Sequence, residues 1–250
     1  MSQKPPPKKF IKTPITGTKS TILISSAKGG VGKSTVAVNL AFALQNLGLK
    51  IGILDADVYG PSLTKLLDLK EKPKSQDGKA MIPVEKYNAQ CMSMGLLVDE
   101  QTPMIWRGPM VISALRTMTQ KVLWKERDVI IIDMPPGTGD IQLTISQSVQ
   151  IDSSVIVTTP HQLSLTDVRK GIMMFDKVNI PVLGIIENMS YFKCDIGKKY
   201  YIFGEAGAKS LNERFGLKTL IELPIIKELN SSYDSIMNSE YSSNTVDEVI

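Results

Sequence analysis

Residues 24–35 read Ile24-Ser-Ser-Ala-Lys28-Gly-Gly-Val-Gly-Lys33-Ser-Thr35, and the 250-residue sequence is best interpreted outward from them. The apolar run Thr21–Ile24 leads into this stretch, and the helically spaced segment Val36–Leu44 follows it. A phosphate-binding loop needs this order of strand, glycine-rich turn and helix, because the turn and the positive end of the helix present N–H groups to a polyphosphate. The sequence therefore predicts a nucleotide site here.

The residues of this loop have separate predicted roles. Lys33 would reach the β- and γ-phosphates of ATP, and the hydroxyl of Ser34 would ligate Mg²⁺. Ala27 stands where the strict G-x-x-x-x-G-K-[ST] pattern has glycine, and a second lysine, Lys28, opens the glycine-rich part. The residues predicted to bind the nucleotide through the loop are Lys28, Gly29, Gly30, Val31, Gly32, Lys33, Ser34 and Thr35.

Composition limits the class of protein. A chain that is 42% hydrophobic and 250 residues long can bury the core of one α/β domain, and it has no apolar run long enough to cross a membrane. Two cysteines are too few for a disulfide framework, which favours a reducing compartment such as the cytoplasm. Five lysines lie in residues 1–19, and the remainder has 24 basic against 25 acidic residues. A broad basic surface for nucleic acid is therefore not predicted.

The pattern of elements predicts a doubly wound α/β fold, with a mainly parallel sheet and helices on both faces. Residues 1–19 are rich in lysine and proline and predict a flexible arm, residues 20–228 the nucleotide-binding domain, and residues 229–250 a loose C-terminal tail. The expected strands after the first helix are 50–55, 81–84, 90–97, 129–133, 154–159, 181–186 and 219–223. The expected helices are a short one near residue 62 and longer ones at 109–120, 141–149, 165–177 and 206–215, and residues 68–80 read as an exposed loop.

Three acidic residues follow predicted strands at the edge of the sheet where ligands bind in parallel α/β folds. Asp133 closes the apolar run Val129–Ile132 and fits an acid that holds Mg²⁺ through water. Asp57 would orient the attacking water, and Asp55 would support the Mg²⁺ shell, although a turn-capping role is an equal alternative for one of the two. The stretch Pro135–Asp140 predicts a stiff switch near the γ-phosphate.

The remaining candidates are an amide, two thiols and an imidazole. Asn188 follows a predicted strand and is placed to read the adenine edge, with a simple turn residue as the alternative. Cys91 lies in an apolar strand pattern and is interpreted as a packing residue, whereas Cys194 lies in a polar, lysine-containing loop and is the better candidate for a reactive or metal-binding thiol. His161 is the single histidine, which argues against a zinc site.

Taken together, these motifs resemble the Mrp/ApbC family of ATP-dependent iron–sulfur cluster carriers, and the loop resembles the deviant Walker A motif of the MinD/ParA class of P-loop NTPases. The resemblance covers about Lys19 to Pro224. It rests on the phosphate loop and on the blocks Leu54–Ser62, Ile105–Met110, Asp133–Asp140, Thr158–Pro160 and Glu187–Tyr191.

The resemblance implies a homodimer that sandwiches ATP, in which Lys28 reaches the partner's phosphates and hydrolysis is slow. It also implies transfer of iron–sulfur clusters to apoproteins. The near-neutral charge of residues 20–250 and the short, acidic C-terminus argue against a nucleic-acid or membrane partner. The family carries Cys-x-x-Cys after the Asn-Met-Ser block, and here Cys194 matches only the first cysteine. A dimer would then offer two thiolates where a cluster normally takes four ligands. A member that has lost its cluster and a positioning ATPase of the MinD/ParA kind therefore remain alternatives.

Overall fold

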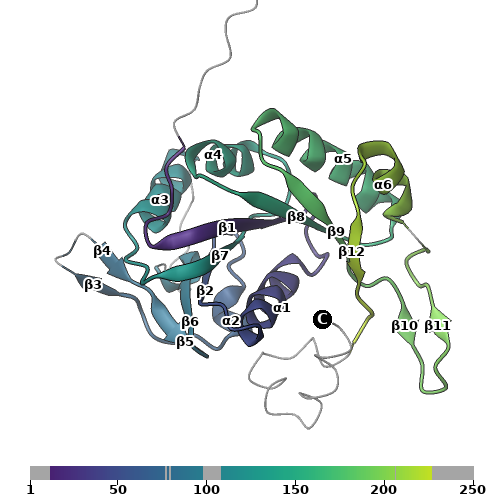
Figure 1. Ribbon diagram of the computed structural model, residues 1–250, viewed down its shortest axis with the longest axis horizontal. Helices are drawn as coiled ribbons and strands as arrows, with labels where there is room; N and C mark the ends of the chain where they lie inside the picture. The colour runs from purple at the N-terminus through teal and green to yellow at the C-terminus, as the bar shows by residue number, and fades with distance from the viewer. Residues whose placement is uncertain (1–11, 77, 79, 98–107, 206, 227–250) are drawn as a thin grey trace, which may run out of the picture.

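The structure is a computed structural model that describes residues 12–76, 78, 80–97, 108–205 and 207–226 (Figure 1). Its main sheet is made of β1 (Thr18–Ser25), β2 (Ile51–Asp55), β5 (Val84–Lys86), β6 (Ala89–Ser93), β7 (Arg127–Asp133), β8 (Ser153–Thr158), β9 (Val182–Glu187) and β12 (Thr219–Glu222). Two small sheets pair β3 (Lys74–Gln76) with β4 (Ala80–Ile82), and β10 (Phe192–Lys193) with β11 (Lys199–Tyr200). The helices are α1 (Lys33–Asn46), α2 (Leu63–Leu66), α3 (Gly108–Gln120), α4 (Asp140–Ser148), α5 (Gln162–Lys177) and α6 (Lys209–Phe215), with a 3₁₀ turn η1 at Met94–Leu96.

The strand order places β1 in the middle of the main sheet. The order is β12-β9-β8-β1-β7-β2-β6-β5, and every pair is parallel except β5 with β6. The chain leaves β1 toward β2 on one side and returns later to β8 on the other, so a topological switch point lies at the carboxyl end of β1. Ligands bind at such points in doubly wound sheets. The predicted fold class is confirmed.

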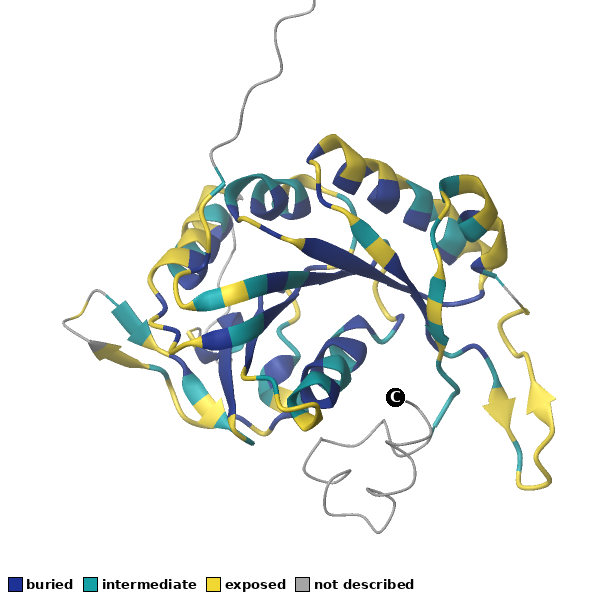
Figure 2. Cartoon of the chain, viewed as in Figure 1, coloured by how far each residue is buried: buried dark blue, intermediate teal, exposed yellow. Residues whose placement is uncertain are grey.

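Two apolar cores, one on each face of the sheet, hold the layers together (Figure 2). Helices α1 and α2 cover one face, and Phe42 and Leu63 are among the buried side chains they contribute. Helices α3, α4, α5 and α6 cover the other face, where Leu115 and Phe175 are buried (Figure 1). Strands such as β2 and β8 are buried along their whole length because both of their faces are covered, which explains their uninterrupted apolar runs.

The folded part of the chain begins earlier than the predicted arm allows. Thr13 forms a parallel bridge with Val149, the Nζ of Lys12 donates to the carbonyl of Val178 at 2.7 Å, and the side chain of Ile15 is buried. Residues 12–19 are therefore part of the domain, and the prediction of an arm is wrong for them. Residues 1–11 and 227–250, which include the predicted tail 229–250, lie outside the described residues, as do Trp106 and Arg107 of the quoted motifs.

Other boundaries differ from the sequence-based expectation for local reasons. Part of the expected loop at 68–80 forms β3, which pairs with β4. The expected strand 90–97 ends at Ser93, because the Ser93 hydroxyl accepts a hydrogen bond from the N–H of Gly95 at 3.1 Å and caps the turn η1. The expected helix 206–215 begins at Lys209. None of the helices in the described ranges is both long and apolar enough to cross a bilayer.

Candidate functional site

The phosphate loop between β1 and α1 has the backbone that a polyphosphate site requires. Gly30 and Gly32 have φ angles of 78° and 79°, in the left-handed region that favours glycine. The helix α1 starts at Lys33, so its unpaired N–H groups open toward the loop. A pocket of about 280 Å³ lies there. Its lining residues are Ser26, Gly29, Gly30, Gly32, Lys33, Ser34, Thr35, Asp57, Ser62, Leu66 and Pro136.

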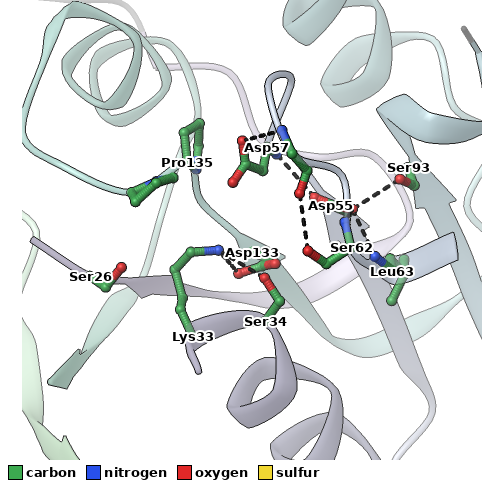
Figure 3. Close-up of polar contacts among 12 residues, drawn as sticks. Ser26, Lys33, Ser34, Asp55, Asp57, Ser62, Leu63, Ser93, Asp133 and Pro135 are labelled. Carbon is green, nitrogen blue, oxygen red and sulfur yellow. Dashed lines mark hydrogen bonds and ion pairs between the residues drawn. The ribbon is translucent and has the colours of Figure 1, made fainter. Parts of the chain in front are cut away.

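Lys33 and Asp133 form a buried ion pair at the floor of this pocket (Figure 3). Both side chains are almost fully buried, and the Ser34 hydroxyl lies 3.2 Å from the Nζ of Lys33. Asp133 closes β7, directly beside the end of β1, so the register of the two strands brings it to the loop. Burial raises the pKa of Asp133, and the charge of Lys33 opposes that rise. The lysine predicted to bind phosphate is therefore paired with the acid predicted to hold Mg²⁺.

Asp55 is the capping residue of the segment that contains Asp57. Its carboxylate accepts hydrogen bonds from the N–H groups of Asp57, Ser62 and Leu63 at 3.0–3.1 Å, and from the Ser93 hydroxyl at 3.0 Å. Burial, followed by the negative charge of Asp133, raises the pKa of Asp55 to about 7. Of the two roles weighed for it, these contacts support turn capping, and a part in the Mg²⁺ shell stays a prediction.

Asp57 lies between the phosphate pocket and a second pocket. Its Oδ1 accepts hydrogen bonds from the N–H groups of Tyr59 and Gly60 at 3.2 Å, which fixes the side chain in the turn. The second pocket, about 460 Å³, is bounded by Asp57 and Pro136, which also line the first. Asp57 therefore stands where the two spaces meet, as its predicted role beside an attacking water requires.

The segment that follows Asp133 is fastened to the phosphate loop. The N–H of Gly137 donates to the carbonyl of Ser26 at 2.8 Å, and the Ser26 hydroxyl donates to the carbonyl of Lys28 at 2.9 Å. The buried amide of Gln142 donates to the carbonyl of Pro135 at 3.2 Å and so holds the turn from within α4. A shift of the loop on binding phosphate would therefore reach this segment directly.

Asn188 packs against the phosphate loop from β9. Its Nδ2 donates to the carbonyl of Val31 at 2.9 Å, and the side chain is buried. The same nitrogen fills the space where a side chain on Gly32 would stand. The structure brings Asn188 to the nucleotide site as predicted, whereas contact with an adenine edge stays a prediction.

Replacing Gly32 by alanine should weaken ATP binding by about tenfold or more. The new Cβ would overlap the Asn188 amide, and the residue would have to keep a left-handed conformation that costs about 1–2 kcal/mol. Gly30→Ala is the matched control, because it has nearly the same φ and nothing within 4 Å of its Cβ position. Titration calorimetry with ATP should show the larger loss for Gly32→Ala, and equal losses would contradict the role given to Asn188.

The two cysteines lie in different environments. Cys91 is fully buried in β6, and burial raises its pKa to about 12, which confirms the packing role. Cys194 is half-buried in the turn of the β10–β11 hairpin, where its N–H donates to the carbonyl of Lys198 at 3.1 Å. The hairpin projects from the body of the domain and is largely exposed (Figures 1 and 2).

Because Cys91 is buried and Cys194 is not, the two thiols should differ in how fast they react with a thiol reagent. The folded protein should release one equivalent of the coloured thiolate from Ellman's reagent quickly, and a second only after denaturation, because a buried thiol with a high pKa does not react. The Cys194→Ser variant should lose the fast equivalent. Two fast equivalents from the native protein would show that β6 does not protect Cys91.

The phosphate loop offers some of the ligands that a divalent cation needs, and substrate phosphates would supply others. Ser34 and Asp133 meet at the loop, and Mg²⁺ is held in many such sites by one carboxylate, substrate phosphates and water. Within the described ranges, no group of three or more His, Cys, Asp or Glu side chains is arranged to hold a metal ion. The donor set thus fits Mg²⁺ bound together with a nucleotide.

The structure brings most of the predicted nucleotide-site residues together, namely Gly29, Gly30, Gly32, Lys33, Ser34, Thr35, Asp57, Asp133 and Asn188. Lys28 belongs to the same loop and is exposed, and Cys194 lies apart on the hairpin. Sequence reasoning missed Ser93, Gln142 and Glu187, whose side chains support the site from the neighbouring strands and from α4. Ser93 and Gln142 lie outside the quoted motifs, and Glu187 opens one of them with no role assigned to it, since the partners of these side chains are backbone groups or a distant acid.

Fold and site together define a P-loop NTPase. The chain belongs to the NUBPL iron-transfer P-loop NTPase family, whose model in the ParA group matches residues 17–249. It is similar to an Arabidopsis thaliana protein named iron-sulfur protein required for NADH dehydrogenase, mitochondrial, with 50% identity over 87% of this chain and 70% of that protein. It is also similar to the iron-sulfur cluster carrier protein of Escherichia coli K12, with 47% identity over 88% of this chain and 60% of that protein.

Solved structures agree with the fold. A nucleotide-binding protein from Archaeoglobus fulgidus, in complex with ADP, superposes with a TM-score of 0.76 at 37% identity and covers 86% of both chains. The cell division ATPase MinD of Pyrococcus furiosus superposes with a TM-score of 0.65 at 21% identity, over 91% of this chain and 94% of its own. Because the identity to MinD is only 21%, that similarity supports the fold alone.

Proposed function

We propose that this protein binds and hydrolyses ATP and carries iron–sulfur clusters to apoproteins. The observation that carries the proposal is the combination, in one domain, of a phosphate loop with its Lys33–Asp133 pair and an accessible thiol, Cys194, six residues beyond the Asn188 that contacts the loop. The family assignment and the names of the relatives from Arabidopsis and Escherichia coli support the cargo.

In the ATPase reaction, the residues of this chain position charge and water. The loop N–H groups and Lys33 bind the phosphates, and Lys33 leaves Asp133 to do so. Asp57 orients the attacking water for in-line displacement. Lys28, exposed at the loop, reaches the phosphates bound by the partner of a homodimer. Ser34 and Asp133 would hold Mg²⁺, which would neutralise charge on the phosphate oxygens.

The cluster is held at Cys194. Each subunit of a homodimer supplies one thiolate, so the cluster needs two ligands besides the two Cys194 thiolates. These come from Asp195 or from an external thiol. A cluster with exchangeable ligands suits a carrier, because a recipient protein with its own cysteines can replace them. The protein acts in the cytoplasm, a proposal supported by its two free cysteines.

Transfer to a recipient tests this function directly. Protein loaded anaerobically with a cluster should convert an apo-ferredoxin to its coloured holo form faster than the same amount of free iron and sulfide does. Addition of ATP and Mg²⁺ should change that rate for the wild type but not for the Asp57→Asn variant, which keeps the loop. A rate equal to that of free iron and sulfide would contradict the carrier role.

A second candidate function rests on the same hairpin. Cys194 is the only cysteine of the segment 191–200, so the chain supplies half of the expected thiols. An ATP-gated protein that binds an assembly partner without holding a cluster would have this composition. It would bind ATP normally and give no cluster under any loading condition.

A further inference from the structure

Residues 187–190 join the phosphate loop to the hairpin that carries Cys194. Asn188 contacts the loop through Val31, and the hairpin strand β10 begins only two residues after Ser190. Between them, Met189 has a φ of 56°, a left-handed conformation that a non-glycine residue keeps only where its surroundings hold it. The turn therefore has a defined conformation, and it connects the phosphate loop to the hairpin that carries Cys194.

The side chain of Glu187 holds this turn from inside the domain. It is 1% exposed, and its Oε2 accepts a hydrogen bond from the N–H of Ala208 at 2.6 Å. The Ser190 hydroxyl lies 2.7 Å from the carbonyl oxygen of Glu187 and 3.1 Å from its Oε1. The buried carboxylate thus links the end of β9 to the residue that precedes α6, and it shares the Ser190 hydroxyl with the main-chain carbonyl of Glu187.

Main-chain hydrogen bonds fix the turn at both of its ends. The N–H of Asn188 donates to Thr158 of β8 at 2.8 Å, and the N–H of Ser190 donates to Leu223 at 2.9 Å. The carbonyl of Tyr191, at the entrance to the hairpin, accepts from the N–H of Ile225 at 2.7 Å. If the phosphate loop displaces Asn188, the turn can either deform or move as a unit and displace Tyr191. The hydrogen bond between Glu187 and Ser190 favours movement as a unit.

We propose that Glu187, through the contacts of its carboxylate with Ala208 and Ser190, is a positioning residue that transmits the nucleotide state of the phosphate loop to Cys194. The proposal rests on the proposed function, which makes Cys194 the cargo residue, and it adds the route by which ATP acts on that residue. When phosphates draw Lys33 away from Asp133, the loop and its hydrogen bond to Asn188 shift together. Glu187 keeps the turn in one shape, so the shift reaches the hairpin.

The reactivity of Cys194 measures this coupling without any cluster. The buried Cys91 does not report, so the alkylation rate with iodoacetamide belongs to Cys194 alone. A non-hydrolysable ATP analogue with Mg²⁺ should change the rate in the wild type, in either direction, by about fivefold or more, the lower end of typical coupling between sites. A wild-type rate that does not respond to saturating nucleotide would overturn the proposal.

Four variants separate positioning from a purely structural role. In Glu187→Leu the N–H of Ala208 loses its acceptor, and the nucleotide should no longer change the alkylation rate although it still binds. Glu187→Gln should restore the response, because its amide oxygen can accept from Ala208 and its NH₂ can donate to Ser190. Ser190→Ala keeps the bond to Ala208 and should give a reduced response. Glu222→Gln, at the paired position on β12 where the side chain is exposed, should behave as wild type.

Two outcomes would count against Glu187. If Glu187→Leu binds nucleotide and shows the full wild-type response, the turn does not need this side chain. Should Glu187→Leu fail to fold, a full wild-type response in Ser190→Ala would refute the tie across the turn by itself. Because all measurements use cluster-free protein, a failure of cluster binding would leave these results interpretable and would count only against the proposed function.

Discussion

Replacing Lys33 by alanine should lower ATP affinity by about two orders of magnitude or more. The lysine makes several charge-assisted hydrogen bonds to phosphate oxygens, each worth about 1.5–3 kcal/mol, and alanine makes none. Calorimetric titration of the variant with ATP and Mg²⁺ should therefore give no measurable heat of binding. Affinity equal to that of the wild type would refute the assignment of the nucleotide site.

The same substitution should also destabilise the nucleotide-free protein. Asp133 is buried and paired with Lys33, and removing one partner of such a pair costs about 3–5 kcal/mol. The loss should be smaller in acid, because Asp133 can take up a proton there and its pKa rises further without the lysine. Urea unfolding at pH 7.5 and pH 5 measures both effects.

A double variant separates binding from stability. Lys33→Ala/Asp133→Asn removes both charges, so it should recover much of the unfolding free energy that Lys33→Ala loses, yet it should still fail to bind ATP. A double variant no more stable than Lys33→Ala would mean that the buried charge of Asp133 is not the cause of the loss.

The free energy of unfolding should also depend strongly on pH, because of Asp55. Burial raises its pKa in the folded protein to about 7, against 3.8 for an unperturbed aspartate, so between these values the native protein holds more protons than the unfolded chain. The contribution of this group to stability is therefore greatest below about pH 4 and declines as pH rises toward 7, by an amount on the order of a few kcal/mol.

The Asp55→Asn variant should show a much shallower decline in unfolding free energy between pH 4.5 and 7, measured by urea denaturation with EDTA and no nucleotide. The variant should be less stable at low pH, since an amide with a single acceptor oxygen replaces a carboxyl group whose two oxygens share four donors. Asp128→Asn, at a half-buried acid that binds Lys19, is the control and should leave the decline between pH 4.5 and 7 in place. An unchanged slope in Asp55→Asn would contradict the assignment to Asp55.

The elements that sequence predicts well are those whose signal is local and repeated. Strands β7 and β8 are recognisable because burial on both faces requires continuous apolar runs, and the phosphate loop is recognisable because its backbone requires glycines at fixed spacing. Parallel pairing then brings Asp133 to the loop, since β1 and β7 end at the same edge.

The contacts that sequence does not predict depend on distant partners. Residues 12–17 are held in the domain by a bridge to Val149 and by the burial of Ile15. Neither contact produces a local pattern in the sequence. The capping of Asp55 by Ser93 joins residues 38 positions apart, and the tie from Glu187 to Ala208 joins residues 21 apart. A glutamate at the end of an apolar strand looks in sequence like any exposed acid, and only the chain around it shows that it is buried.

The central claim is that this P-loop NTPase carries its cluster at Cys194, and anaerobic reconstitution with iron and sulfide tests it most directly. Iron content and visible absorbance would be measured for the wild type, Cys194→Ala and Cys91→Ala, each with its ATP binding checked. The account predicts a cluster on the wild type and on Cys91→Ala, and none on Cys194→Ala. A wild type that binds ATP but no cluster, or a cluster that survives in Cys194→Ala, would contradict it.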